Sequence, residues 1–153
     1  MRYIDKVLQP GEQILYSSKL HWMIYFPPVF LLIIAIGIFG FGLAVDRDTA
    51  GIVFLVGAIS VVLALLMFVG AWIERWTTEI EVTDRRVVYK RGLIRRETVE
   101  MNMDKVESVD VNQSILGRVF DYGDVIVRGT GVGWKPLRKI DTPLTFRNHI
   151  IAR

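Results

Sequence analysis

The chain has 153 residues and no cysteine, which excludes disulfide bonds and thiolate metal sites and fits a reducing compartment. Histidine is almost as scarce, since only His21 and His149 occur, and neither has a second ligand at helical spacing. We therefore expect no zinc site. The acidic residues form no evident acid–base pair, and no Gly-Lys-Ser/Thr follows the glycines of 129–133, so there is no P-loop. The sequence favours a protein that is not an enzyme and holds no cofactor.

Charge is also missing from two long apolar runs, Trp22–Val45 and Ile52–Ile73. Each run exceeds the roughly 20 residues that cross a bilayer as a helix, and only Asp46–Gly51 separates them. The pair predicts a transmembrane helical hairpin over residues 22–73. A cleaved signal peptide is disfavoured because a second apolar run follows the first directly. Ion and proton pathways need ionisable groups inside the membrane, so we interpret the hairpin as an anchor rather than a transporter or channel.

The basic residues lie unevenly around these runs. Of the 19 lysines and arginines, three precede the first run, Arg47 lies between the runs, and the other fifteen follow the second run. Basic residues near spans are retained on the cytoplasmic side. We therefore expect both termini in the cytoplasm and the short loop on the other side of the membrane.

Small residues recur at helical spacing on both runs. In an antiparallel pair of helices, Gly40 would fall near Gly57 and Gly37 near Ser60. Small residues let helix backbones approach closely within lipid. We predict that these four residues form the packing face of the hairpin.

After the second run the pattern changes to short alternating segments separated by turn residues. Strands are expected at Thr78–Val82, Val87–Tyr89, Thr98–Met103, Val106–Val111, Asp124–Arg128 and Leu137–Ile140. Gly92 can supply the positive φ of a tight turn, and Leu116 and Phe120 are expected to fold back onto the core. Asp141 or Thr142 followed by Pro143 predicts a C-terminal helix.

The fold class is therefore α+β, with a transmembrane helical hairpin followed by a small antiparallel barrel or sandwich that ends in a helix. The expected division is a cytoplasmic segment over 1–21, the hairpin over 22–73, with spans at about 22–45 and 52–73, and a cytoplasmic domain over 74–153.

Several stretches of the chain carry a more specific resemblance. They are Leu8–Glu12, His21–Trp22, Val82–Tyr89, Gly92–Ile94, Val106–Arg118 and Tyr122–Val125. Together they resemble the bacterial membrane-anchored pleckstrin-homology (PH) domain family, in which a two-helix hairpin precedes a PH-like domain. The resemblance implies a PH-like fold and a multi-pass location in the bacterial cell (inner) membrane. It implies no activity.

Basic residues supply the candidate contacts. Arg85, Arg86, Lys90, Arg91, Arg95 and Arg96 cluster within twelve residues, and Trp134 and Lys135 follow a glycine-rich segment. Arginine and lysine can hold phosphate by charge-assisted hydrogen bonds, and an anionic bilayer attracts basic residues. A tryptophan on a loop tip can contact a partner or a membrane, and burial of Trp134 in the core is the alternative. A solvated strand face, with the basic residues paired to nearby carboxylates, would explain the same cluster.

We expect a non-catalytic binding or assembly module at the inner face of the membrane, with a protein or a second copy of the chain as partner. The alternative is a sensor of anionic lipid headgroups that uses the basic cluster. Nucleic-acid binding is not expected, because residues 74–153 hold fifteen basic against twelve acidic residues and form no basic stripe.

Overall fold

The computed structural model describes residues 3–93, 96–130, 132–133 and 136–151. The chain divides into two compact units. One unit, the hairpin, comprises residues 22–73. The other, the domain, combines residues 1–21 with residues 74–153. This differs from the expected division, in which residues 1–21 were a separate segment.

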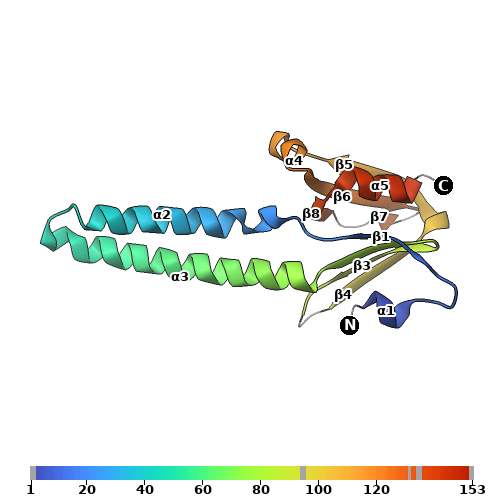
Figure 1. Ribbon diagram of the computed structural model, residues 1–153, viewed down its shortest axis with the longest axis horizontal. Coiled ribbons are helices and arrows are strands. Elements are labelled where there is room, and N and C mark those ends of the chain that lie inside the picture. The colour runs from blue at the N-terminus through green and yellow to red at the C-terminus, as the bar shows by residue number, and fades with distance from the viewer. Residues whose placement is uncertain (1–2, 94–95, 131, 134–135, 152–153) are drawn as a thin grey trace. The chain divides into compact units, whose positions relative to one another are not determined.

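The hairpin consists of a 3₁₀ turn and two helices (Figure 1). These are η1 (Trp22–Tyr25), α2 (Phe26–Gly42) and α3 (Arg47–Thr77), and the last residues of α3 belong to the domain. Two helical segments, Trp22–Gly42 and Arg47–Thr77, are long and apolar enough to cross a membrane. The connection is shorter than expected, because the N–H groups of Thr49 and Ala50 donate to the carbonyl of Asp46 and start α3 before the apolar run.

The two helices pack through phenylalanine rings set against glycines. A Cβ added at Gly57 would lie 3.1 Å from the ring of Phe39, and one added at Gly42 would lie 2.8 Å from the ring of Phe54. The two rings stack on each other with their centroids 5.9 Å apart. Glycine therefore makes room for an aromatic ring of the opposite helix.

The predicted packing face is distributed differently from the expectation. A Cβ added at Gly37 or Gly40 would meet nothing within 4 Å, so neither residue lies at a close contact. The hydroxyl of Ser60 donates to the carbonyl of Val56 in its own helix at 2.8 Å. Of the four predicted residues, Gly57 is the one whose surroundings require a small residue, because the bulky Phe39 ring occupies the space beside it.

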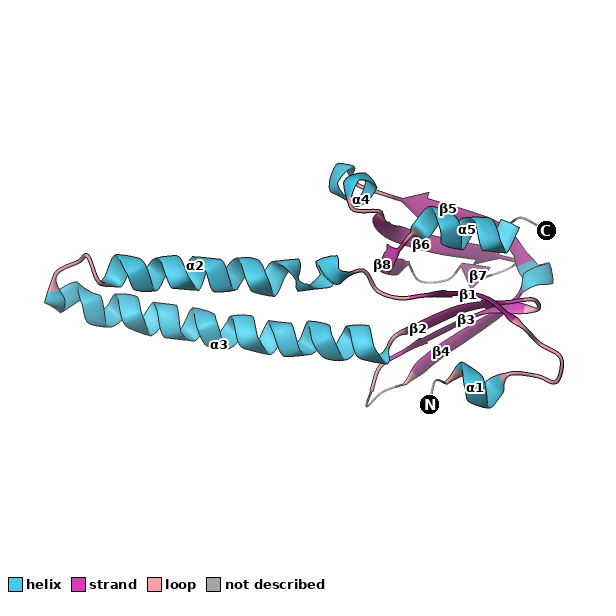
Figure 2. Cartoon of the chain, viewed as in Figure 1, coloured by secondary structure: helices cyan, strands magenta, loops and turns pink. Residues whose placement is uncertain are grey.

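The domain contains two antiparallel sheets and a C-terminal helix (Figure 2). Sheet A has the order β1-β2-β3-β4, formed by Ile14–Ser18, Glu79–Thr83, Arg86–Arg91 and Glu97–Asn102. In sheet B, β6 (Tyr122–Gly129) pairs with the remaining three strands, β5 (Val106–Asn112), β7 (Val132–Gly133) and β8 (Leu137–Asp141). The terminal helix is α5 (Pro143–Ile151). The six predicted strands and the terminal helix are confirmed, and Gly92 has the expected positive φ of 94°.

Strand β1 was not predicted, and it changes how the chain is organised. It pairs with β2 in antiparallel register, with Ser18 opposite Ile80 and Ile14 opposite Thr83. Residues 19–78 therefore leave sheet A after one strand and return to it at the next. The hairpin is an insertion between two adjacent strands of the domain.

The core of the domain lies between the sheets, and α5 covers it. Phe146 is fully buried and contributes the largest side chain, and α5 packs on β5 and β6 as well as on β1 and β2. At one corner the sheets are joined, since the N–H of His21 donates to Lys139 and the N–H of Asp141 donates to Lys19. No closed barrel forms among the described residues.

A short helix, α1 (Ile4–Val7), precedes β1. Ile4 is buried, and the backbone N–H of Tyr3 donates to Glu79 of β2 at 2.6 Å. The 3₁₀ turn η2 (Met103–Lys105) joins β4 to β5, and the helix α4 (Ile115–Val119) joins β5 to β6. Tyr3 and Ile4 thus pack against the domain.

Candidate functional site

The predicted basic cluster does not converge on one site. Arg86 and Arg91 are the first and last residues of β3, and a strand of this length holds its ends about 17 Å apart. Arg85 precedes the strand and Arg96 follows it. A single phosphate group cannot contact both ends, so the cluster separates into two smaller groups.

Arg86 is the most enclosed of the described residues of the cluster. Its side chain is 11% exposed, and that of its partner Glu12 is 0% exposed. Nε and Nη2 of Arg86 donate to the two carboxylate oxygens of Glu12 at 3.0 and 2.9 Å. Nη1 donates to Glu100 at 2.8 Å, and Nη2 also donates to the carbonyl of Val7 at 2.7 Å. Arg86 therefore connects the N-terminal residues to sheet A.

The pKa values of this pair agree with a structural role. Burial disfavours the charged form of Glu12, yet its pKa lies below the ordinary value of 4.5. The N–H of Gln9, the hydroxyl of Thr83 and the guanidinium of Arg86 together outweigh burial. The hydrogen bond to Glu12 raises the pKa of Arg86 in turn. Both side chains stay charged at neutral pH and satisfy each other.

Lys90 and Arg91 also face carboxylates. Nζ of Lys90 lies 2.9 Å from Glu79, and 5.5 Å from the centre of the Tyr3 ring. Nη2 of Arg91 lies 2.7 Å from Glu74, the residue that directly follows the apolar run. These pairs neutralise much of the positive charge that the sequence groups together.

Three described residues of the cluster are exposed: Arg91, which is paired with Glu74, and also Arg85 and Arg96. Arg85 makes contacts with Asp84 and Gln9 in the turn between β2 and β3. Arg96 is exposed before β4. Arg95, Trp134 and Lys135 lie outside the described residues, so their predicted contacts stay predictions.

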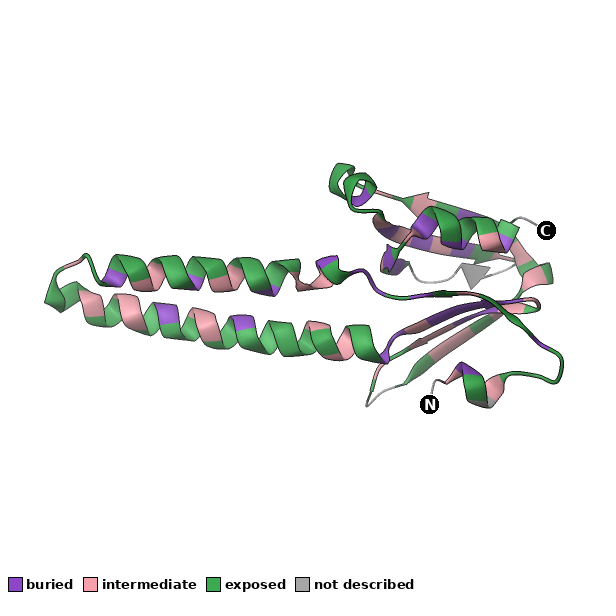
Figure 3. Ribbon diagram, viewed as in Figure 1, coloured by how far each residue is buried: buried purple, intermediate pink, exposed green. Residues whose placement is uncertain are grey.

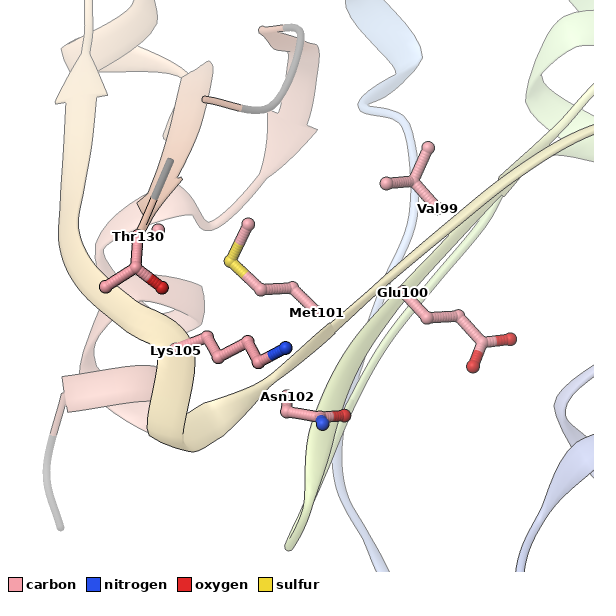
Figure 4. Close-up of a pocket in the computed structure, with 7 residues that line it drawn as sticks. Val99, Glu100, Met101, Asn102, Lys105 and Thr130 are labelled. Carbon is pink, nitrogen blue, oxygen red and sulfur yellow. The ribbon is translucent and has the colours of Figure 1, made fainter. Parts of the chain in front are cut away.

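A pocket of about 320 Å³ opens at the corner between the two sheets (Figure 4). It is lined by residues of β4, η2 and the end of β6: Val99, Glu100, Met101, Asn102, Lys105, Gly129 and Thr130. Sequence reasoning did not find this pocket, because its two walls come from segments that only the sheet topology brings together.

The pocket has an apolar floor and a polar rim. Val99 and Met101 project to the side of β4 that faces Thr130, whereas Glu100 points to the other side, where it accepts from Arg86 (Figure 4). A Cβ added at Gly129 would lie 2.6 Å from the carbonyl of Lys105 and 2.8 Å from the sulfur of Met101. Glycine at 129 therefore allows the close approach of β6 to η2 that shapes the pocket.

Strand β4 is the outer strand of sheet A. Among the described residues, it pairs only with β3. The outer edge of a sheet offers backbone N–H and C=O groups to an added strand. The pocket lies beside this edge, so both features can serve one extended ligand.

The connection between β5 and β6 departs from the expectation. Leu116 and Phe120 were expected to fold back onto the core, and both are exposed instead. The reason is local: the amide of Gln113 donates to the carbonyls of Gly117 and Tyr122 and holds α4 against the start of β6. The core of the domain is already filled by α5 and the strands.

No metal centre can be built from the part of the chain that the structure describes, since no group of three or more His, Cys, Asp or Glu side chains converges there. His149 stacks on Tyr16 with ring centroids 4.6 Å apart, and its Nδ1 lies 2.8 Å from the carbonyl of Thr145. His21 stacks on Tyr122 with ring centroids 5.2 Å apart. Both histidines thus have structural contacts.

Comparison with known proteins identifies a family. The family model described as the bacterial PH domain matches residues 28–153, which is most of the chain. No curated protein and no solved structure matches significantly. The two antiparallel sheets and the C-terminal helix agree with the family match.

Proposed function

This chain belongs to the bacterial PH domain family, and from that premise we propose that it is a membrane-anchored, non-catalytic binding module on the cytoplasmic face of a bacterial membrane. Binding is the general role of PH-like domains. The proposal adds an anchor, an orientation and a surface for the partner.

The insertion of the hairpin between β1 and β2 is the observation that carries the anchor. Because Ser18 is paired with Ile80, the segments before and after the two apolar runs lie side by side in one sheet. They must then lie on the same side of any bilayer, which favours two crossings over one. Only 11% of the most apolar stretch of each helix is buried, whereas a core helix of a soluble protein would be mostly buried.

The distribution of basic residues supports the orientation, since all but one of the 19 lie outside the loop between the runs. The chain has no cysteine, so a single introduced cysteine reports its own side of the membrane. In intact spheroplasts, an impermeant maleimide should label Asp48→Cys in the first turn of α3, between the two apolar runs, and should spare the exposed Thr130→Cys until the cells are lysed. The reverse pattern would refute the orientation. Release of the protein by alkaline carbonate would refute the anchor.

We place the protein-binding surface at the β4 edge and the adjoining pocket. An extended segment of a partner could add to β4 by backbone hydrogen bonds and could insert an apolar side chain over Val99 and Met101. Backbone pairing with β4 selects little for the sequence of the partner, whereas the pocket selects for an apolar side chain at one position of the added strand.

Site-specific photocrosslinking in native membranes tests this surface. A photoreactive residue at the exposed Asn102, on β4, should give a protein adduct, while the same residue at the exposed Thr145, on α5, should not. An adduct with the mass of two chains would identify self-association. Equal crosslinking from both positions, or none from Asn102, would count against the β4 surface.

A second candidate function is the recognition of anionic lipid headgroups. One observation favours it: Arg91, the last residue of β3, contacts Glu74, so the turn from β3 to β4 begins beside the residue that follows the second apolar run, and the exposed Arg96 directly precedes β4. Phosphatidylglycerol in nanodiscs should then slow hydrogen exchange in this turn, and combined Arg91→Glu and Arg96→Glu changes should abolish the effect. If the domain instead binds a protein at the β4 surface, these changes should leave photocrosslinking from Asn102 intact.

A further inference from the structure

The helix α4 presents apolar side chains outward. Ile115, Leu116 and Val119 are 82%, 58% and 71% exposed, and Figure 3 shows the helix almost entirely in the colour of exposed residues. Contiguous exposed apolar side chains on a small domain indicate a surface that meets something apolar.

The helix is well supported despite its shortness. The hydroxyl of Ser114 accepts from the N–H of Gly117 at 3.1 Å and caps the first turn. The side chain of Gln113 donates to the carbonyls of Gly117 and Tyr122 at 3.3 and 3.2 Å. A Cβ added at Gly117 would lie 2.6 Å from the carbonyl of Tyr122, so only glycine permits this close packing. The apolar side chains are therefore held in fixed outward directions.

The position of α4 within the domain indicates what its exposed apolar side chains contact. The ring of Tyr122, which begins β6 just after α4, stacks on His21 with an interplanar angle of 23°. His21 directly precedes Trp22, the first residue of the first apolar run. Two residues of chain span at most about 7 Å, so Phe120, one residue past the end of α4, lies close to Tyr122. The helix thus lies at the end of the domain where the chain passes into the apolar run.

The second apolar run leaves from the same end. Nε of Arg75, two residues beyond that run, donates to the carbonyl of Leu20 at 3.0 Å. The N–H of His21 donates to Lys139 at 2.8 Å and fixes this part of the chain to sheet B. Leu20, His21 and Arg75 therefore mark the end of the domain that adjoins both apolar runs, and α4 shares it.

We propose that α4 is an additional membrane contact, which places Ile115, Leu116 and Val119 in the interfacial layer between the lipid headgroups and the acyl chains. This inference rests on the proposed anchoring function. Interfacial binding of this kind depends on buried apolar area. Arg118 and Asp121 offset each other in charge at this place, so raised salt should not weaken the contact. The contact would restrict tilting of the domain on the membrane.

Single-cysteine fluorescence in vesicles tests the proposal. The full-length chain, with an environment-sensitive dye on a cysteine introduced by Ile115→Cys or Val119→Cys, is reconstituted into vesicles of phosphatidylethanolamine and phosphatidylglycerol. Lipids that carry a nitroxide either near the headgroup or deep in the acyl chain serve as quenchers, so that both an interfacial and a buried position can be quenched. Two reference positions are used: Leu63→Cys within α3, and Leu15→Cys, an exposed apolar position on β1.

We expect blue-shifted emission at positions 115 and 119 and severalfold stronger lipid quenching there than at position 15, unchanged by added salt. Quenching at 63 but not at 115 or 119 would overturn the inference and leave the anchor standing. Absence of lipid quenching at 63 would overturn both. A blue shift at 115 without lipid quenching would mean that a protein or a second copy covers α4, and would also overturn the lipid contact.

A charge placed in the apolar surface gives a second readout. Val119→Glu, in a chain labelled at position 115, should remove the quenching and the blue shift. Because Val119 is exposed, the substitution should leave hydrogen exchange in the strands of the domain unchanged. Quenching that persists in the Val119→Glu variant would also contradict the proposal.

Discussion

Replacing Arg86 by methionine should destabilise the domain far more than removing an exposed arginine. Arg86→Met keeps most of the side-chain volume but leaves the fully buried carboxylate of Glu12 without its cation. Breaking a buried ion pair from one side costs about 3–5 kcal/mol, because an uncompensated charge remains in the interior. The pair Arg128–Asp110 is a matched control, since both side chains are at least half exposed and such pairs contribute about 0–1 kcal/mol.

Native-state hydrogen exchange of the full-length protein in detergent micelles measures this difference. The slowest amides of β2 and β3 exchange only when the domain opens, so their rates report its stability without interference from the helices of the hairpin. Each 1.4 kcal/mol is a factor of ten, so Arg86→Met should accelerate these amides by about two to four powers of ten. Arg128→Met should accelerate them by less than about tenfold.

A second substitution separates the buried charge from simple loss of packing. Adding Glu12→Gln to Arg86→Met removes the orphaned charge, so the double variant should be more stable than Arg86→Met alone. Equal acceleration by Arg86→Met and Arg128→Met would refute the structural role of Arg86. A failure of Glu12→Gln to recover any stability would also refute it, and the arginine would then be free to serve a ligand.

Three other features of the structure can be tested, each with its own measurement. The pKa of Glu12 is lowered in the folded domain, so its contribution to stability is present above its ordinary pKa of 4.5 and is lost as pH falls through the lower folded value. Hydrogen exchange at stepped pH should show this loss of stability in the wild type and a weaker dependence of stability on pH in Glu12→Gln. Gly57→Leu should destabilise the hairpin by about 1–3 kcal/mol because the new side chain overlaps the Phe39 ring, whereas Gly40→Leu should be nearly neutral. Thermal unfolding of the helices, followed by circular dichroism in micelles, compares the two variants. Equal effects would contradict the packing of phenylalanine rings against glycines. Gly129→Ala should push Met101 and the Lys105 backbone away from residue 129 and so weaken photocrosslinking from Asn102. Gly51→Ala is the control, because an added Cβ there meets nothing within 4 Å, and unchanged crosslinking in Gly129→Ala would argue against a role of the pocket.

The sequence predicts the helices, strands and turns that depend mainly on interactions between residues close together in the chain. The length of the two apolar runs identifies the helices of the hairpin, and alternation identifies the strands after residue 77, because both signals are contained in a single segment. Gly92 adopts its expected positive φ, and Pro143 begins the last helix as expected. These features depend on few residues beyond their neighbours.

Strand β1 could not be found in this way. Ile14–Ser18 is only five residues long and shows no alternation of apolar and polar residues. It becomes a strand because β2 lies beside it, although residues 19–78 separate the two in sequence. A strand that depends on a distant partner leaves little signal in its own composition.

The basic cluster illustrates the same limit for the candidate site. Spacing along the chain grouped its six members, but an extended strand separates Arg86 from Arg91. The carboxylate that holds Arg86 lies 74 residues earlier in the chain, within the stretch assigned to a separate segment. The exposed helix α4 was missed because apolar residues in a connection are usually buried, and only the finished core reveals that no room remains for them.

The insertion between β1 and β2 also fixes an order of events during biosynthesis. A ribosome delivers β1 first, then both apolar helices, and only then the residues that complete sheet A. Until translation has passed residue 83, the nascent β1 has no neighbouring strand, and the buried Glu12 lacks the guanidinium of Arg86. In the proposed topology, sheet A therefore closes only after both helices have entered the membrane, and a chain whose helices failed to insert as a pair would leave β1 and the rest of sheet A on opposite sides of the bilayer.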